Sequence, residues 1–303
     1  MKSRRILAVG SVALDTVKTP FGRVKEALGG SATFFSASAR FFSKVSVVAV
    51  VGRDFPKKYL TLMNRLGVDM KNLSIESGKT FRWSGEYNYD LNCAKTLKTD
   101  LNVFATFKPK INPEYRFSDV VFLANIDPEI QLEVLRQVRR PALSACDTMN
   151  YWIGTKKRHL VDLLKKVDVF LCNESEAREL TGEYNLKLAA RWVMSHGPRI
   201  FVVKKGEHGV VCFTRESLFL APAYLLEKVF DPTGAGDTFA GGFIGYMAGA
   251  SSRITDRVIR KAIIYGTVLA SYNVESFSLN RLAKLKHAEI EQRYKLFERC
   301  TKF

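Results

Sequence analysis

The stretch DPTGAGDTFAGGF, from Asp231 to Phe243, decides the fold of this chain. Small or apolar residues occupy nearly every position of the range Gly236–Gly249, which predicts a buried helix. Gly234, Ala235 and Gly236 then form the turn that opens this helix. Their backbone N–H groups have no partner inside the helix, and the helix dipole adds positive potential there. Because glycine lets a phosphate approach the backbone, the helix start predicts an anion site.

Asp237 lies just inside this predicted anion site. An acid beside a bound phosphate opposes binding, because like charges repel. Its position is explained if the acid accepts a proton from a hydroxyl group that attacks the phosphate. The alternative is that Asp237 only complements the positive end of the helix dipole.

The string DPTGAGDTFAGGF closely resembles the C-terminal signature of the ribokinase-like, or PfkB, family of carbohydrate and nucleoside kinases. The resemblance implies an ATP- and Mg²⁺-dependent kinase that phosphorylates a hydroxymethyl group of a sugar or of a sugar-containing compound. A nucleoside kinase of the same family is the alternative, followed by a non-catalytic member that only binds ligands. In this family Asp237 would be the general base, and the N–H groups of Gly234, Ala235 and Gly236 would stabilise the transferred phosphoryl group.

Two further segments resemble the metal-binding elements of the family. Asn173-Glu-Ser-Glu176 follows a predicted strand and begins a predicted helix, like the N-x-x-E element, whose Asn and final Glu organise the hydration shell of Mg²⁺. The alternative is an ordinary helix N-cap with acidic residues in the first turn. Asp231 and Thr233 resemble the positions that bind a monovalent cation (K⁺) in many members.

The nucleotide side is expected in the segment Lys204–Gly209, between two predicted strands. From the residues alone it can be a hairpin turn with glycine at positive φ. The resemblance places it over ATP, with Lys205, Gly206 and Gly209 near the nucleotide. Asn273 resembles a residue of the adenine-side wall.

The acceptor side is expected near the N-terminus. Gly29 and Gly30 lead into a predicted helix and match the N-terminal G-G motif of the family, and Asp15 matches the acid that binds sugar hydroxyls. A carboxylate accepts hydrogen bonds from two hydroxyl groups, which suits a vicinal diol. The chain departs from the family at Phe34, where the resemblance predicts Asn. An aromatic face there replaces one sugar contact and leaves both a sugar and a nucleoside open as acceptor.

Composition limits the function classes. The 303 residues are 47% hydrophobic and 25% charged, which is sufficient for a full globular core. The net charge of +17 is unusual, but the Lys and Arg residues are scattered, without a basic tail or a basic stripe with interleaved aromatics. We therefore expect attraction of polyanionic substrates such as ATP, or simple solubility, rather than nucleic-acid binding. The four histidines lack metal-ligand spacing.

The cysteines and the hydropathy of the chain indicate the cellular compartment in which the protein is expected. Five cysteines without a C-x-x-C pair are typical of a reducing compartment. The start of the chain has basic residues before a short apolar run, as a signal peptide has, but Asp15 interrupts the run and a strand over Arg5–Val9 explains it better. The longest low-polarity segment, Phe239–Ala250, is far shorter than the roughly 20 residues of a membrane span. We expect a cytoplasmic protein without a membrane partner.

The order of predicted elements indicates an α/β fold. From about residue 119, short apolar strands alternate with helical segments, which predicts β-α-β units and a doubly wound, mostly parallel sheet with helices on both faces. We expect one domain over residues 1–303. The predicted strands are Arg5–Val9, Val120–Ala124, Ala142–Cys146, Val169–Cys172 and Ile200–Lys204. The predicted helices cover residues 128–139, 156–166, 174–180, 186–195, 236–249, 254–272 and 286–299.

Two segments interrupt this alternation, at about residues 15–28 and 75–107. In the second, Phe81, Trp83, Tyr87 and Tyr89 alternate with polar residues, which predicts a half-buried antiparallel strand. We expect the two segments to pair into a small accessory sheet. The resemblance implies a lid over the substrate, and such a sheet can also be a structural flap or the contact of a homodimer.

Overall fold

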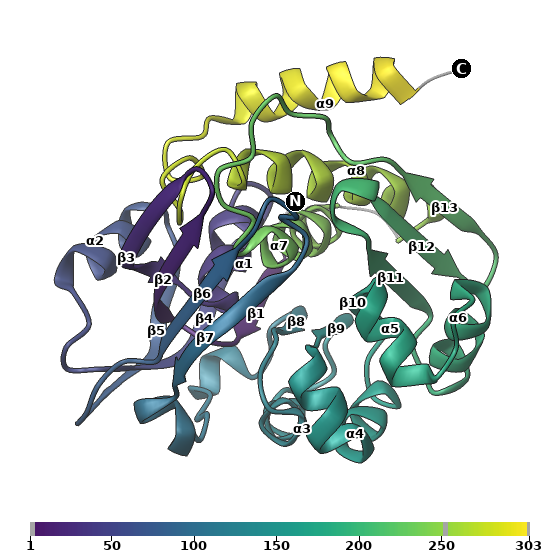
Figure 1. Cartoon of the computed structure of the whole chain (residues 1–303). Helices are drawn as coiled ribbons and strands as arrows, with labels where there is room; N and C mark the ends of the chain where they lie inside the picture. The colour runs from purple at the N-terminus through teal and green to yellow at the C-terminus, as the bar shows by residue number, and fades with distance from the viewer. Residues whose placement is uncertain (1–3, 251–253, 302–303) are drawn as a thin grey trace.

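The computed structural model describes residues 4–250 and 254–301, and strands alternate with helices through most of this range (Figure 1). A nine-stranded sheet has the order β13-β12-β11-β10-β9-β8-β1-β4-β5. The pairs from β11 to β5 are parallel, whereas β12 and β13 add antiparallel edge strands. The strands are β1 (Arg5–Val9), β4 (Lys44–Gly52), β5 (Asp69–Glu76), β8 (Val120–Leu123), β9 (Leu143–Asp147), β10 (Val169–Asn173), β11 (Ile200–Lys204), β12 (Val210–Thr214) and β13 (Leu218–Ala221).

Helices cover both faces of this sheet, because successive apolar residues of a buried strand point to opposite sides. In β1, Leu7 and Val9 pack in one core with α3, α4, α5 and α6, while Ile6 and Ala8 pack in a second core with α1, α7 and α8. The predicted doubly wound fold is confirmed. The helices are α1 (Ser31–Ala39), α2 (Lys57–Arg65), α3 (Pro128–Gln137), α4 (Asn150–Leu164), α5 (Glu174–Thr181), α6 (Leu186–Ser195), α7 (Ala235–Gly249), α8 (Asp256–Asn273) and α9 (His287–Thr301).

Some helix boundaries differ from the prediction. α4 begins at Asn150, six residues before the predicted start, and Lys156 has non-helical angles (φ −134°, ψ 32°) inside it. α8 begins at Asp256, since the hydroxyl group of Thr255 accepts a hydrogen bond from the N–H of Val258 and caps the helix. No helix in the described ranges is long and apolar enough to cross a membrane.

A separate four-stranded sheet, the small sheet, has the order β3-β2-β6-β7. Its strands are β2 (Ala13–Thr19), β3 (Gly22–Gly29), β6 (Arg82–Tyr87) and β7 (Ala94–Asp100). The predicted pairing of the two insertions is thus confirmed. β6 is antiparallel to β7, as predicted, but it runs parallel to β2. Residues 75–76 belong to β5 of the large sheet, so the second insertion leaves the main fold later than predicted.

Candidate active site

Polar and charged side chains gather where the central parallel strands end. Asp147 is the last residue of β9, Asn173 ends β10 and Lys204 ends β11. Because parallel strands end at the same edge of a sheet, these three side chains lie on one side of the molecule. The Nζ atom of Lys204 lies 2.6 Å from Oδ2 of Asp147; the side chain of Asp147 is buried, and that of Lys204 is 17% exposed.

The glycine-rich loop opens α7 at this edge. Gly234 is the N-cap residue and has a left-handed conformation (φ 74°, ψ 4°). A Cβ at this position would lie 2.3 Å from the ring of Phe34, so only glycine fits. Ala235 donates its N–H to the carbonyl of Pro232, whereas the N–H groups of Gly234 and Gly236 have no hydrogen-bond partner within the described residues. The predicted anion site therefore has two free donors in this state.

Asp237 occupies the first turn of α7. Burial raises its pKa to about 7, the charge of Asp147 adds to this rise, and the charge of Lys204 opposes it. A carboxyl group with a pKa near neutrality can accept and release a proton, which suits a general base.

Lys204 supplies a positive charge next to the loop. A Cβ built on Gly236 would lie 3.2 Å from the Nζ atom of Lys204, which places the ammonium group beside the first turn of α7. Burial lowers the pKa of Lys204, but the carboxylates of Asp147 and Glu176 outweigh it and leave the pKa above its ordinary value. The lysine is therefore charged at neutral pH.

Asn173 and Glu176 form a reciprocal capping box at the start of α5. The Oδ1 atom of Asn173 accepts the N–H of Glu176 at 2.8 Å, and Oε2 of Glu176 accepts the N–H of Asn173 at 2.7 Å. The helix-cap interpretation is thus correct for the geometry. It does not exclude a second role, because Oε1 of Glu176 accepts no hydrogen bond from the described residues and burial raises the pKa of this carboxyl group to about 7.

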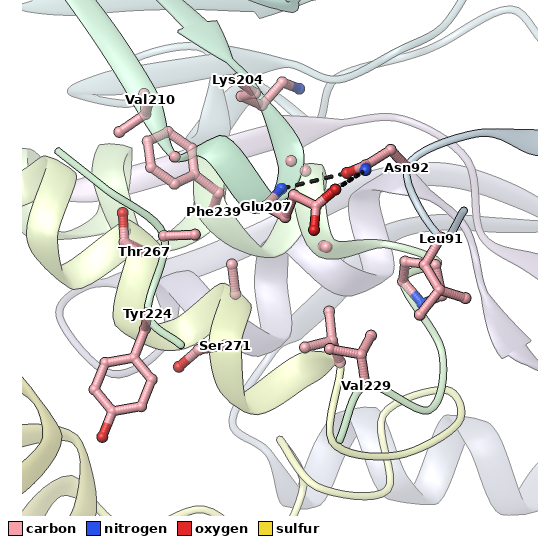
Figure 2. A pocket seen from close by; sticks show the side chains of 18 of the residues that line it. Leu91, Asn92, Lys204, Glu207, Val210, Tyr224, Val229, Phe239, Thr267 and Ser271 are labelled. Atoms are coloured by element: carbon pink, nitrogen blue, oxygen red, sulfur yellow. Dashed lines mark hydrogen bonds between the residues drawn. The ribbon is translucent and has the colours of Figure 1, made fainter. Parts of the chain in front are cut away.

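A cavity of about 520 Å³ lies between the loop that opens α7, the strand ends and α8 (Figure 2). Of the predicted residues, the cavity is lined by Asn173, Glu176, Gly206, Gly209, Ala235 and Gly236. Lys204 also lines it, as do residues of the segment that joins β6 to β7. Figure 2 shows this segment bonded to the loop after β11. Asn92 donates Nδ2–H to Glu207 at 2.8 Å, and its Oδ1 accepts the N–H of Glu207 at 3.2 Å.

Two residues predicted on the nucleotide side lie outside the lining of this cavity. The Nζ atom of Lys205 lies 3.6 Å from Glu174. Asn273 is buried, and its Nδ2–H donates to the carbonyl of Thr233 at 2.9 Å, so it supports the glycine-rich loop from behind. Any contact of either residue with a nucleotide stays a prediction.

On the acceptor side, the structure brings Asp15 close to the glycine-rich loop. Burial raises the pKa of Asp15 to about 7; the N–H of Gly30 opposes this rise, and the charges of Asp231 and Asp237 add to it. A Cβ at Gly29 would lie 1.8 Å from Oδ2 of Asp15, so glycine is required for this carboxylate to keep its place.

Phe34 lies on the same side but presents no open aromatic face, because it is only 2% exposed and packs against Gly234.

The small sheet contributes a residue that the sequence prediction did not assign to the site. Tyr87 of β6 accepts a hydrogen bond from the Thr233 hydroxyl at 3.4 Å. Burial raises the pKa of this phenol to about 12, and the charges of Asp231 and Asp15 add to the rise.

Asp231, predicted at a monovalent cation site, connects two loops in this structure. Its Oδ1 accepts the N–H of Thr233 at 2.9 Å and its Oδ2 accepts the N–H of Ser278 at 3.3 Å. Across the described residues, no group of three or more His, Cys, Asp or Glu side chains converges in a way that could hold a metal. Any divalent ion here would take most of its ligands from water and phosphate, as Mg²⁺ does in nucleotide sites.

Asp147 and Lys204 are the main site residues that the sequence prediction missed. The sequence did contain an indication of both, because each is a charged residue at the end of a mostly apolar strand. In doubly wound sheets, ligands bind at the carboxyl ends of the strands. The prediction assigned the nucleotide contact to Lys205 instead, one residue beyond β11.

A parallel sheet with this helix start, a half-buried acid in the first helical turn and a neighbouring ammonium group has the parts expected of a phosphoryl-transfer site. The family model described as pfkB family carbohydrate kinase matches residues 4–284, and the chain belongs to this family. The predicted resemblance is confirmed.

Relatives agree with this assignment. The chain is 32% identical over 251 residues to a cytidine kinase of Thermococcus kodakarensis, a match that covers 80% of this chain and 89% of the relative. It is 22% identical over 302 residues to a nucleoside kinase of Methanocaldococcus jannaschii, covering 91% and 92%. The solved structure of a Burkholderia thailandensis nucleoside kinase in complex with ADP-inosine superposes with a TM-score of 0.82 at 17% identity, covering 98% of this chain and 96% of the other. The protein is an ATP-dependent carbohydrate or nucleoside kinase.

Proposed function

We propose that the protein transfers the γ-phosphoryl group of ATP to the hydroxymethyl group of an uncharged nucleoside. The observation that carries this proposal is the position of Asp237 in the first turn of α7, next to the free N–H groups of the helix start, together with its pKa of about 7, which suits a general base. A free sugar is the second candidate, since a single carboxylate at Asp15 is sufficient to bind a vicinal diol.

In the proposed reaction the acceptor hydroxyl group gives its proton to the carboxylate of Asp237. Its oxygen forms a bond to the γ-phosphorus, the bond from that phosphorus to the β–γ bridging oxygen breaks, and ADP leaves with the electron pair. The N–H groups of Gly234, Ala235 and Gly236 stabilise the charge on the transferred group, for which Ala235 must release Pro232. Lys204 adds a positive charge at the same place.

Mg²⁺ is proposed to bind near Glu176, which has one free carboxylate oxygen on the cavity wall. The ion would neutralise charge on the ATP phosphates. Asn173 and Glu176 fix each other through the capping box, so the carboxylate direction is set before any ion binds. A monovalent cation such as K⁺ is proposed near Asp231 and Thr233, behind the glycine-rich loop.

The nucleotide is proposed to occupy the 520 Å³ cavity, whose volume suits a small molecule. Its phosphates would lie at Gly236 and Lys204, and Gly206 and Gly209 would lie along it. Lys205 and Asn273 remain proposed contacts at its margins.

The acceptor is proposed to be uncharged because Asp15 already lies near two other carboxyl groups. Burial is the main cause of the raised pKa of Asp15, and the charges of Asp231 and Asp237 add to the rise. A phosphorylated or carboxylated sugar would add a further negative charge to this group. The nucleoside is preferred over the free sugar on the kinship with a cytidine kinase. Gly29, Gly30 and Phe34 are proposed to shape the acceptor site around Asp15.

An ATP-consumption screen tests this function directly. Purified protein is offered cytidine, inosine, adenosine, ribose, fructose, inositol and a sugar phosphate, with Asp237→Asn as the inactive control. We expect turnover with at least one nucleoside and none with the sugar phosphate. Turnover only with the sugar phosphate would contradict the proposal, and turnover only with free sugars would favour the second candidate.

The small sheet is also proposed as a homodimer contact. β7 is an outer strand of that sheet, and its Leu97 is 53% exposed. An outer strand with an exposed apolar residue is a surface at which a second sheet can pair. Light scattering at micromolar concentration tests this contact, and a mass of one chain would contradict it.

A cytoplasmic location is proposed from the cysteines. Cys93, Cys146, Cys172, Cys212 and Cys300 are all free thiols, as is typical of proteins in a reducing compartment. Cell fractionation tests the location, and recovery outside the cytoplasm would contradict it.

A further inference from the structure

The C-terminal helix α9 lies beyond the residues that the family model matches, which end at 284. Figure 1 shows this helix lying along α8, and the two helices are in contact. Two of its side chains, Arg293 and Phe297, contact Tyr224 in the segment that leads from β13 to the glycine-rich loop.

That segment, residues 222–229, forms one wall of the cavity. Ala223, Tyr224, Leu225, Leu226 and Val229 line it. Neither helix nor strand occurs in this segment, and among the described residues it makes no backbone–backbone hydrogen bond. The position of the wall therefore depends on side-chain contacts.

Arg293 of α9 provides such a contact. Its guanidinium group lies 4.8 Å from the ring centroid of Tyr224 and 3.4 Å from that of Tyr272, so it stands against two aromatic rings. Its Nη1–H donates to the hydroxyl group of Ser271 at 2.9 Å, and its Nη2–H donates to Glu275 at 2.6 Å. The arginine thus joins the loop to α8.

Two of these partners line the cavity in which the nucleotide is proposed to bind. Tyr224 and Ser271 both line the cavity, and Figure 2 labels both on its wall. A second residue of α9, Phe297, packs on Tyr224 with 5.8 Å between ring centroids. A cation held between tyrosine rings and paired with a carboxylate fixes its neighbours more firmly than apolar contact alone.

We propose that Arg293 is a positioning residue for nucleotide binding, and that α9 completes the end of the cavity that receives the base. The proposal rests on the function proposed above, in which the phosphates lie at Gly236. A nucleotide that extends from there along the cavity meets the wall formed by Tyr224, Leu226 and Ser271. Arg293 touches the wall and not the nucleotide.

Calorimetric titration of ATP into Asp237→Asn protein, with and without Arg293→Met, tests the proposal without turnover. We expect Arg293→Met to weaken ATP binding about tenfold. In the otherwise unchanged enzyme the same substitution should raise the KM for ATP and leave kcat and the acceptor KM within about twofold, because the arginine acts on nucleotide binding only. Arg299→Met is the matched control, since Arg299 is exposed on the same helix.

Two further variants separate positioning from general stability. Arg293→Lys keeps the charge and should recover part of the ATP affinity. Tyr224→Ala should weaken ATP binding to a similar degree, and adding Arg293→Met to it should have little further effect. If Arg293→Met does not fold, Tyr224→Ala alone decides the question. Unchanged ATP affinity in a folded Arg293 or Tyr224 variant would overturn the inference. Failure of the parent protein to bind ATP would instead contradict the proposed function.

Discussion

Glycine at position 29 leaves space for the carboxylate of Asp15, the proposed acceptor-binding group. Any Cβ there would meet Oδ2 of Asp15 at 1.8 Å, and Asp15 would have to move. We expect Gly29→Ala to lower kcat/KM for the acceptor about 10²-fold, the usual effect of displacing a binding group by about 1 Å. Steady-state kinetics with varied acceptor measure this.

Gly154→Ala is the control for this substitution. A Cβ at Gly154 meets nothing closer than 3.8 Å, so activity should be unchanged. Equal kinetics of the Gly29 and Gly154 variants would show that the close approach of Gly29 to Asp15 has no role in acceptor binding.

Lys204 and Lys205 are adjacent, but their surroundings differ. Lys204 lies beside Gly236 and pairs with the buried Asp147, whereas Lys205 pairs with Glu174 at 3.6 Å. We expect Lys204→Met to lower kcat by about 10²–10³-fold, as the loss of a charge-stabilising group does. Lys205→Met should lower it far less. Single-turnover rates compare the two, with thermal denaturation to confirm folding, and the opposite ranking would assign the phosphate contact to Lys205.

Local spacing in the sequence was sufficient to single out some of the candidate site residues. Asp237 follows a glycine-rich turn, and Asn173 and Glu176 have N-cap spacing, so both positions are readable from local sequence. Asp147 and Lys204 were not predicted, because their importance depends on β9, β10 and β11 lying side by side. The burial of Phe34 was not predicted either. An aromatic residue in a glycine-rich motif suggests a ligand contact, but burial under Gly234 is decided by tertiary packing.

At the scale of elements, the segment between β6 and β7 is bonded to the loop after β11. Asn92 and Glu207 exchange two hydrogen bonds at the wall of the cavity, although they are 115 residues apart in sequence. This contact holds the end of the small sheet over the proposed nucleotide site.

We expect Asn92→Ala to raise the KM for ATP by about two- to tenfold, since one or two such bonds contribute about 0.5–1.5 kcal/mol each. Asn88→Ala, an exposed residue of the same segment, is the control. Glu207→Ala should resemble Asn92→Ala, and the double variant should add little. Additive losses in the double variant would show that the two residues act separately.

The elements themselves were predicted to different degrees. α6 and the strands β1 and β11 have the predicted bounds, because their apolar runs have clear ends. The early start of α4 and the irregular Lys156 were not predicted, since the polar first turn has no apolar period. The parallel pairing of β6 with β2 was also missed, because strand alternation does not reveal direction.

For the whole molecule, the fold could be predicted because strand–helix alternation permits few arrangements. Strand order was not predictable from the sequence alone. The order depends on which strands the crossover connections join. The first strand, β1, lies inside the sheet, third from the β5 edge, and later strands are added on both sides of it.

Three carboxyl groups with raised pKa values make both the stability and the activity of the protein depend on pH. Asp15, Glu176 and Asp237 have pKa values of about 7 in the folded state, above the ordinary values of 3.8 and 4.5. The folded protein therefore binds more protons than the unfolded chain between these values. Its free energy of unfolding should fall as pH rises from about 4 to 7, while activity should rise as Asp237 loses its proton.

Urea denaturation between pH 5 and 8 measures the stability part of this prediction. Asp237→Asn removes one of the three groups, so the variant should gain stability relative to the parent as pH rises. Parallel stability curves for the two proteins would contradict the raised pKa of Asp237.

The most direct test of the account is phosphoryl transfer by Asp237→Asn. The amide keeps the size of the side chain but cannot accept the proton of the acceptor hydroxyl group. With an acceptor identified by the screen, we expect kcat to fall by about 10²–10⁴-fold, while the dissociation constant for ATP, measured by calorimetry, stays within about threefold of the parent value. Turnover of Asp237→Asn at the rate of the parent enzyme would contradict the account, because the proton would then have to go to another group.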